Sequence, residues 1–244
     1  MTGGSSAILT YHSLDDSGSV VSTPPALFRR QMEFLAASRI PVVPLDQVAG
    51  HPGAVAITFD DGFRNLLSHA IPVLEQHGFP ATIFAVSDYC GRMNDWPSQP
   101  QGAVPLLPLL SWDELAALPS LISMGAHTAT HPDLSRLSAQ ECERELHDCQ
   151  SRMEQRLARP VRWLAYPYGT SSAAVRSVAA RYFDLAVGTT LGFLPQRSDR
   201  LNLPRLDTYY LRGSFPIERL FSPWGRPYMG FRRMLREFRQ KLPV

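Results

Sequence analysis

Short runs of apolar residues alternate along the chain with stretches in which apolar residues recur every three or four positions. A short apolar run bounded by turn residues is typical of a buried strand, and the wider spacing is typical of a helix with one face in the core. The runs predict strands at Ala7–Tyr11, Ile40–Pro44, Val55–Phe59, Ala81–Val86, Leu121–Met124, Val161–Tyr166, Leu185–Val187 and Leu203–Leu206. The helical stretches begin at Pro24, Phe63, Ser111, Ser138 and Ser171. This alternation predicts parallel strands with helices packed outside them.

Some of the expected helices carry signals for their ends. Phe63–His77 is predicted as one helix with a kink at Pro72 and a stop at Gly78. Ser111 and Ser138 each precede a glutamate by three positions, which is the pattern of a capping box at a helix start.

The segment Asp88–Leu110 interrupts the alternation and is rich in proline. Loops of this length inside a compact domain are usually functional or disordered. Trp96 could stack on a substrate or hold the loop against the barrel, and we favour the second interpretation.

Composition and charge limit the range of functions. The chain has 244 residues, 44% of them hydrophobic, and a net charge of +2, which fits one domain and does not indicate a nucleic-acid partner. After residue 223, six basic residues are opposed by one acidic residue. We therefore expect a barrel domain over residues 1–223 and a basic, helical C-terminal segment over 224–244. Four apolar residues at helical spacing favour packing of this segment on the barrel, with weak contact to an anionic membrane surface as the alternative: Phe231, Leu235, Phe238 and Leu242.

The three cysteines do not predict a disulfide framework. Cys142 and Cys149 are separated by about 10 Å along one expected helix, too far to form a bridge, so we assign them to the core. No apolar run approaches the roughly 20 residues of a membrane span, and the first six residues lack the pattern of a signal peptide. On these grounds we expect a cytoplasmic protein.

Two adjacent carboxylates, Asp60 and Asp61, directly follow the apolar run Val55–Phe59. Ionised and unpaired at the end of a buried strand, each would cost on the order of several kcal/mol. We therefore expect a cation or a proton between them. The alternative is that both residues cap the helix that follows.

A second polar motif, His127-Thr128-Ala129-Thr130-His131, follows the run Leu121–Met124. Imidazole and carboxylate are ordinary ligands of a catalytic zinc or a similar divalent ion. His12, Tyr168 and Arg205 also lie at or just after the ends of predicted strands. In a parallel barrel these ends share one face, where active sites are built.

These motifs resemble those of the polysaccharide deacetylases, carbohydrate esterase family 4. Thr58-Phe59-Asp60-Asp61-Gly62 is similar to their first motif, His127-Thr128-Ala129-Thr130-His131-Pro132 to their second, and Tyr166-Pro167-Tyr168-Gly169 to their third. The similarity runs from about Ile8 to Asp207. It implies a single-domain, irregular and incomplete (β/α)7-type barrel that binds a metal and removes N-acetyl groups from amino sugars.

The resemblance also implies a role for each residue. Three side chains would hold one divalent metal, zinc in the first place and cobalt, nickel or manganese as alternatives: Asp61, His127 and His131. Asp60 would be the general base, since a bound metal lowers the pKa of its water from 15.7 to about 7 and a carboxylate can then take the proton. The backbone N–H of Tyr168 would help to hold the oxyanion, and Thr128 would tie the ligand loop together.

The chain departs from the family pattern at two points. The third motif normally carries an arginine where this chain has Ala165, and no histidine follows His147, so the late histidine motif is missing. We infer that Arg205 supplies the missing positive charge to Asp60. The alternative is an exposed arginine paired with Asp207.

The stretch Leu9-Thr10-Tyr11-His12-Ser13 resembles a subgroup whose last motif has moved to the N-terminus by circular permutation, and which includes enzymes acting on poly-N-acetylglucosamine. An amine leaving group needs a proton, so we expect a general acid on the side of the substrate opposite Asp60. Once His127 and His131 bind metal, His12 is the histidine that remains on the catalytic face. The alternative is a His12 that only caps its strand.

Three classes of function follow. The first is a metal-dependent deacetylase of an N-acetylated carbohydrate, and without a signal peptide we favour a glycan precursor as its substrate. The second is an amide hydrolase that acts on a non-sugar substrate with the same site. The third is a metal-containing barrel that binds glycan without turnover, which the presence of both a base and an acid disfavours.

Overall fold

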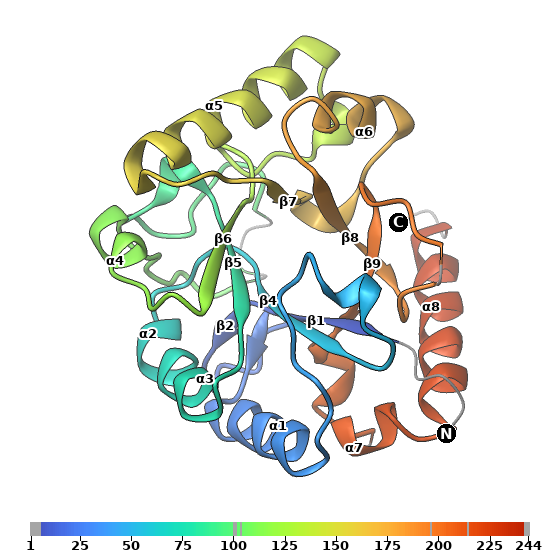
Figure 1. Ribbon diagram of the computed structural model, residues 1–244. Helices are drawn as coiled ribbons and strands as arrows, with labels where there is room; N and C mark the ends of the chain where they lie inside the picture. The colour runs from blue at the N-terminus through green and yellow to red at the C-terminus, as the bar shows by residue number, and fades with distance from the viewer. Residues whose placement is uncertain (1–5, 100–101, 103, 196, 214, 242–244) are drawn as a thin grey trace.

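In the computed structural model, which describes residues 6–99, 102, 104–195, 197–213 and 215–241, seven parallel strands form a closed barrel (Figure 1). Their order around the barrel is β1 (Ala7–Tyr11), β4 (Val55–Phe59), β5 (Ala81–Ala85), β6 (Ile122–Ala126), β7 (Trp163–Ala165), β8 (Leu185–Leu191) and β9 (Leu203–Asp207), and β9 pairs with β1. The short strands β2 (Ser13–Leu14) and β3 (Ser22–Thr23) form a separate parallel pair. The predicted parallel α/β barrel is confirmed, and its irregularity lies in a register shift between β8 and β9.

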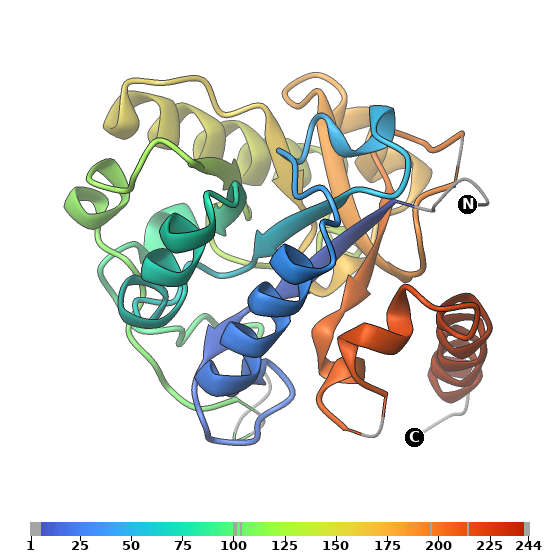
Figure 2. The ribbon, with the colours of Figure 1, turned by 60° about the horizontal axis from the view of Figure 1, so that its bottom comes forward.

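Helices surround the barrel (Figures 1 and 2). They are α1 (Pro25–Ala37), α2 (Leu66–His69), α3 (Ile71–His77), α4 (Trp112–Ala116), α5 (Ala139–Leu157), α6 (Ala173–Ala179), α7 (Ile217–Leu220) and α8 (Gly225–Lys241). Short 3-10 turns lie at η1 (Val48–Gly50), η2 (Ser87–Tyr89), η3 (Leu134–Arg136), η4 (Pro167–Gly169) and η5 (Thr208–Leu211). Both predicted capping boxes are present, at Ser111 before α4 and Ser138 before α5.

Two predicted elements are wrong. Ile40–Pro44 forms only an isolated bridge from Val42 to Val55, because its prolines lack the N–H groups that a strand ladder needs. The expected kinked helix over Phe63–His77 is instead two short helices, and Pro72 lies in the first turn of the second, where a missing N–H costs nothing. Gly78 ends α3 in the left-handed conformation, as predicted.

The barrel interior changes character along its axis. Apolar side chains inside the barrel form a cluster of their own, among them Ile8 and Ala56 near the amino ends of β1 and β4, and Phe84 on β5. Gly125 makes this packing possible, because a Cβ there would lie 2.3 Å from the Phe84 ring. Side chains alternate along a strand, so the inward row that begins with Ala56 continues through Thr58 to Asp60. The apolar plug thus gives way to buried polar groups at the carboxyl ends of the strands.

The larger core cluster lies between the barrel and the helices and contains Cys142 and Cys149. All three cysteines are free, which confirms that the chain is not organised by disulfides. Among the described residues, no helix is both long and apolar enough to cross a membrane. The N-terminal residues 1–5, on which the expectation about a signal peptide partly rests, lie outside the described part of the chain.

The C-terminal helix packs differently from the prediction. Phe231 and Phe238 are 53% and 63% exposed, so they do not face the barrel. The side of α8 that faces the barrel carries Met229, which is buried, and Tyr228. The ring of Tyr228 stacks on that of Phe215, with 3.7 Å between their centroids. The helix is therefore rotated relative to the stripe predicted from spacing. Leu242 lies outside the described residues, as do the side chains of Arg239 and Lys241.

Candidate active site

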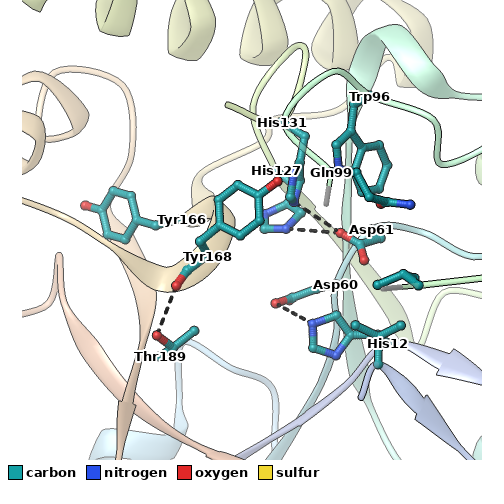
Figure 3. Close-up of a pocket in the computed structure, with 12 residues that line it drawn as sticks. His12, Asp60, Asp61, Trp96, Gln99, His127, His131, Tyr166, Tyr168 and Thr189 are labelled. Carbon is teal, nitrogen blue, oxygen red and sulfur yellow. Dashed lines mark hydrogen bonds and ion pairs between the residues drawn. The ribbon is translucent and has the colours of Figure 1, made fainter. Parts of the chain in front are cut away.

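A pocket of about 130 Å³ lies at the carboxyl ends of the barrel strands. Figure 3 shows His12, Asp60, Asp61, His127, His131 and Tyr168 converging on it from four different strand ends, those of β1, β4, β6 and β7. The expectation that these separate motifs share one face is confirmed for all six residues. Arg205 lies behind the pocket wall, in contact with Asp60.

Three of these side chains meet in a compact cluster. The Nε2 atoms of His127 and His131 each lie 3.4 Å from Oδ1 of Asp61. Two ligands at the tetrahedral angle on bonds of about 2.0–2.1 Å are separated by roughly 3.3–3.4 Å. All three residues are buried, and their ligand atoms lie within 4.8 Å of one another. The cluster therefore fits one divalent ion.

The tautomer of His127 also suits a ligand. Its Nδ1 lies 2.8 Å from the backbone oxygen of Ala165, and donation of that N–H leaves Nε2 free to face Asp61. Burial opposes ionisation of Asp61, but hydrogen bonds from protonated Nε2 groups of the two imidazoles outweigh this and hold its pKa well below the usual range; a metal ion would take the place of those protons. Asp61 thus offers a carboxylate, and His127 a lone pair, to the same point.

Asp60 is clamped by Arg205. The guanidinium Nη1 and Nη2 each donate to one carboxylate oxygen of Asp60 at 2.7 Å, and Nε donates to the carbonyl of Gly188 at 2.9 Å. Burial would raise the pKa of Asp60, but the charge and hydrogen bonds of Arg205 outweigh it and lower that pKa. Arg205 is 2% exposed, so the alternative of an exposed arginine paired with Asp207 is wrong. Asp207 instead accepts from the backbone N–H of Tyr209 and starts η5.

His12 lies at the same wall of the pocket as Asp60. Its Nε2 is 3.8 Å from Oδ2 of Asp60, and its side chain is 24% exposed (Figure 3). We expected the acid and the base on opposite sides of the substrate, whereas the structure places them next to each other. The reason is topological: β1 and β4 are neighbours in the barrel, so the residues that follow them are neighbours too.

Tyr168 and Trp96 close the pocket on the side of the histidines. Tyr168 has a positive φ of 57°, and its hydroxyl donates to the backbone oxygen of Ser98 in the Asp88–Leu110 loop at 2.8 Å. Trp96 is buried and stacks on His131 with 4.3 Å between ring centroids. Because its face is covered by His131, Trp96 holds the loop against the cluster of Asp61, His127 and His131, which agrees with the interpretation favoured from the sequence.

The loop that carries the two histidines is under local strain. Thr128 and His131 have φ values of 68° and 61°, and a positive φ is especially unfavourable for a β-branched residue such as Thr128. The hydroxyl of Thr128 accepts from the backbone N–H of His131 at 3.0 Å, which confirms that Thr128 ties the loop.

Glu145 is a residue of this site that the sequence analysis missed. From α5, one of its carboxylate oxygens accepts from the backbone N–H groups of Ala129 and Thr130 at 3.0 and 2.9 Å, and the other accepts from the Thr130 hydroxyl at 2.7 Å. Three hydrogen bonds to one charged group stabilise a strained loop effectively. In the sequence Glu145 is one of several acidic residues on the polar side of a helix, so no local pattern distinguishes it.

Comparison with known proteins agrees with this geometry. The sequence model of the family described as polysaccharide deacetylase matches residues 47–183, more than half of the chain. The chain belongs to the polysaccharide deacetylase family. The matched region includes the carboxylate pair, the histidine motif and Tyr168, whereas His12 and Arg205 lie outside it.

Individual relatives of this deacetylase-family protein are distant. YxkH of Bacillus subtilis (strain 168), named for the same family, is 25% identical over 170 residues, which cover 66% of this chain and 56% of YxkH. The chain thus spans little more than half the length of that curated relative.

Two solved structures show the same fold. A polysaccharide deacetylase from Bacillus cereus, BC0361, superposes with a TM-score of 0.72 at 23% identity. The match covers 89% of this chain and 68% of BC0361. The Streptococcus pyogenes deacetylase PplD, solved with acetate, has a TM-score of 0.75 at 21% identity and covers 91% of this chain and all of its own.

Glu145→Ala is expected to weaken divalent-metal binding about 10–100-fold, the usual effect of losing an outer partner of a metal ligand. The loop would lose three hydrogen bonds while every ligand remained. Glu145→Gln keeps one oxygen for the two backbone N–H groups and should fall between this variant and wild type. Calorimetry of metal titrations measures the metal affinity. Thermal unfolding of the metal-free proteins measures what the lost hydrogen bonds cost in stability.

Two further variants calibrate that measurement. His127→Ala removes a ligand and should leave less than one metal ion per chain, whereas the exposed Glu75→Gln on α3 should bind as wild type does. Equal metal affinity in Glu145→Ala and wild type would contradict the positioning role, and equal metal content in His127→Ala would contradict the site itself.

Proposed function

We propose that this protein is a metal-dependent hydrolase that removes an N-acetyl group from an amino sugar in a glycan or glycan precursor. The observation that carries the proposal is the buried Asp60, ionised by Arg205, beside the Asp61, His127 and His131 cluster. A barrel that only bound metal and glycan would gain nothing from a second carboxylate that must be kept charged by its own arginine.

The cluster offers two imidazole nitrogens and one carboxylate, a donor set typical of catalytic zinc, and we propose zinc as the ion. When bound, such an ion lowers the pKa of a water from 15.7 to about 7 and polarises a carbonyl oxygen. Asp61, His127 and His131 would hold it, and Trp96, stacked on His131, would exclude solvent from that side.

Asp60 and His12 would divide the proton transfers. Asp60 is a carboxylate at neutral pH because Arg205 lowers its pKa, so it can accept the proton of the attacking water. His12 would donate a proton to the departing amine nitrogen, which is a poor leaving group without one. His12 is partly exposed, whereas Asp60 is buried, so the imidazole is the group that can exchange protons with solvent. The backbone N–H of Tyr168 would stabilise the oxyanion that forms on the acetyl carbonyl.

The size of the pocket suits one end of a substrate. Its volume of about 130 Å³ is below the roughly 300–1,000 Å³ of pockets that enclose a whole drug-sized ligand. An acetamido group would enter, and the rest of the sugar would remain at the mouth near Tyr168. The structural neighbour from Streptococcus pyogenes was solved with acetate, the product of such a reaction.

Release of acetate from three kinds of substrate tests the proposal: N-acetylated oligosaccharides, lipid-linked N-acetylated sugars and simple N-alkyl acetamides. We expect metal-loaded wild type to release acetate from an N-acetyl sugar, and Asp60→Asn to be at least about 100-fold slower because the base is lost. Turnover of simple amides alone would favour a non-sugar amidase. Glycan binding without turnover by the metal-loaded protein would overturn the proposal.

Arg205→Met is expected to move the acidic limb of the kcat/KM profile to higher pH. Removing the guanidinium destabilises the carboxylate, so the pKa of Asp60 rises, by roughly one to three units for a lost arginine partner. Activity measured between pH 4 and 9 would show the shift. Arg205→Lys, which keeps the charge without the paired donors, should show a smaller shift, and the exposed Arg30→Met on α1 should show none. An unchanged profile in a folded Arg205→Met protein would refute the assignment.

His12→Asn should lower kcat for amides about 10²–10⁴-fold, the usual contribution of a general acid, with metal content unchanged. An acetate ester with a good leaving group needs no proton, so its hydrolysis should fall much less. The exposed His147→Asn on α5 is the matched control. Equal losses on amide and ester, or loss of metal together with activity, would show that His12 is not the acid.

A further inference from the structure

Exposed apolar side chains are distributed unevenly over the molecule. Among the described residues, eight large hydrophobic side chains are exposed: Val20, Leu106, Tyr168, Tyr209, Trp224, Phe231, Met234 and Phe238. The first four lie in segments that follow the carboxyl ends of β1, β5, β7 and β9, at the catalytic end of the barrel. The other four lie on α8 or directly before it. Such a concentration marks an interaction surface.

The outward side of α8 is a continuous apolar stripe. Phe231, Met234 and Phe238 are 53%, 58% and 63% exposed and follow one another at spacings of three and four, so they lie on one side of the helix. Trp224, 71% exposed, precedes Phe231 by seven positions and extends the stripe. We call these four residues the α8 stripe.

Contacts on the other side of α8 fix this orientation. Tyr228 stacks on Phe215, and the guanidinium of Arg232 lies 4.6 Å from the centre of the Tyr210 ring. The Nη1 of Arg236 donates to the backbone oxygen of Thr189 at 3.1 Å. The stripe is therefore exposed because the opposite side of the helix is bound to the barrel.

The same contacts place α8 next to the candidate active site. Thr189, which accepts from Arg236, also lines the catalytic pocket, and its hydroxyl donates to the backbone oxygen of Tyr168. Figures 1 and 2 show α8 on the outside of the barrel beside β8 and β9. α8 thus lies beside the strand that contributes Thr189 to the pocket, and the stripe on its opposite side faces away from the barrel.

The charge of the C-terminal segment indicates which kind of partner the α8 stripe would bind. The chain beyond residue 223 has six basic residues and one acidic residue, although the whole protein has a net charge of only +2. Arg232 and Arg236 face the barrel, whereas Arg226 and Arg233 are exposed on α8, with Arg233 paired with Glu237. A segment that combines an exposed apolar stripe with an excess of basic residues has the composition of a helix that lies in the interface of an anionic membrane.

We propose that the α8 stripe docks this protein on an anionic lipid surface along the side of the barrel that α8 covers. A soluble glycan fits the stripe less well, since three of its four side chains, Phe231, Met234 and Phe238, offer no hydrogen bonds to hydroxyl groups. A second copy of the chain also fits less well, because pairing two α8 helices would bring like charges together. The proposal goes beyond the deacetylase function and does not depend on it.

Vesicle flotation with the full-length protein tests the proposal. We expect wild type to float with vesicles of phosphatidylcholine and phosphatidylglycerol but not with phosphatidylcholine alone, and binding to weaken as salt rises. The double variant Phe231→Ser, Phe238→Ser should bind at least tenfold more weakly. Arg233→Glu should also bind more weakly, whereas Arg156→Glu, the same exchange at an exposed position on α5, should not. Thermal unfolding checks that each variant is folded.

Several results would overturn the proposal. One is the absence of flotation with anionic vesicles at low salt, and another is wild-type binding by the folded double variant. Binding of a soluble anionic polysaccharide in place of vesicles, abolished by the same double variant, would assign the stripe to glycan. A concentration-dependent dimer that the double variant abolishes, detected by light scattering, would assign the stripe to a second copy of the chain.

Discussion

The ion pair between Asp60 and Arg205 is the interaction on which the site depends. Two adjacent carboxylates at the end of a buried strand cannot both stay ionised without cations close by. Arg205 neutralises Asp60 from inside the barrel with two hydrogen bonds, and the imidazoles of His127 and His131 face Asp61 from the other side. The two carboxylates thereby acquire different surroundings. One is held by a permanent cation, and the other is directed to a position that a metal ion fits.

The barrel stabilises this arrangement by separating apolar from polar side chains in its interior. Aliphatic and aromatic side chains form a cluster inside the barrel, and its carboxyl end holds threonines, Asp60 and the guanidinium of Arg205. Within this low-dielectric interior a charge-assisted hydrogen bond is strong, and an unpaired charge is very costly. The scaffold therefore stabilises an ionised Asp60 only when Arg205 is present, which links the packing of β9 to the charge at the end of β4.

The loops that form the site are held in unusual backbone conformations. Asp61, Thr128, His131 and Tyr168 all have positive φ values, although none is glycine. Such conformations each cost on the order of 1–3 kcal/mol and persist where the surroundings hold them. Here the Thr128 hydroxyl and the Glu145 carboxylate hold the histidine loop, and the hydroxyl of Tyr168 is bonded to the long loop of residues 88–110. The backbone that carries Asp61, His127 and His131 is thus held in part by contacts outside the cluster itself.

The sequence alone determined the strand-helix alternation, the two carboxylates and the HxxxH motif, because apolar periodicity and motif spacing are local properties of the chain. It also indicated that Arg205 supplies the charge absent at Ala165, but it left open an exposed arginine, and only the closed barrel decided that β9 brings the guanidinium to Asp60. Likewise, the proximity of His12 to Asp60 follows from the pairing of β1 with β4. Glu145 and the rotation of α8 left no local signal, since each is fixed by contacts between segments distant in sequence. Burial and pairing across such distances are properties of the tertiary structure, and they set which charged groups meet.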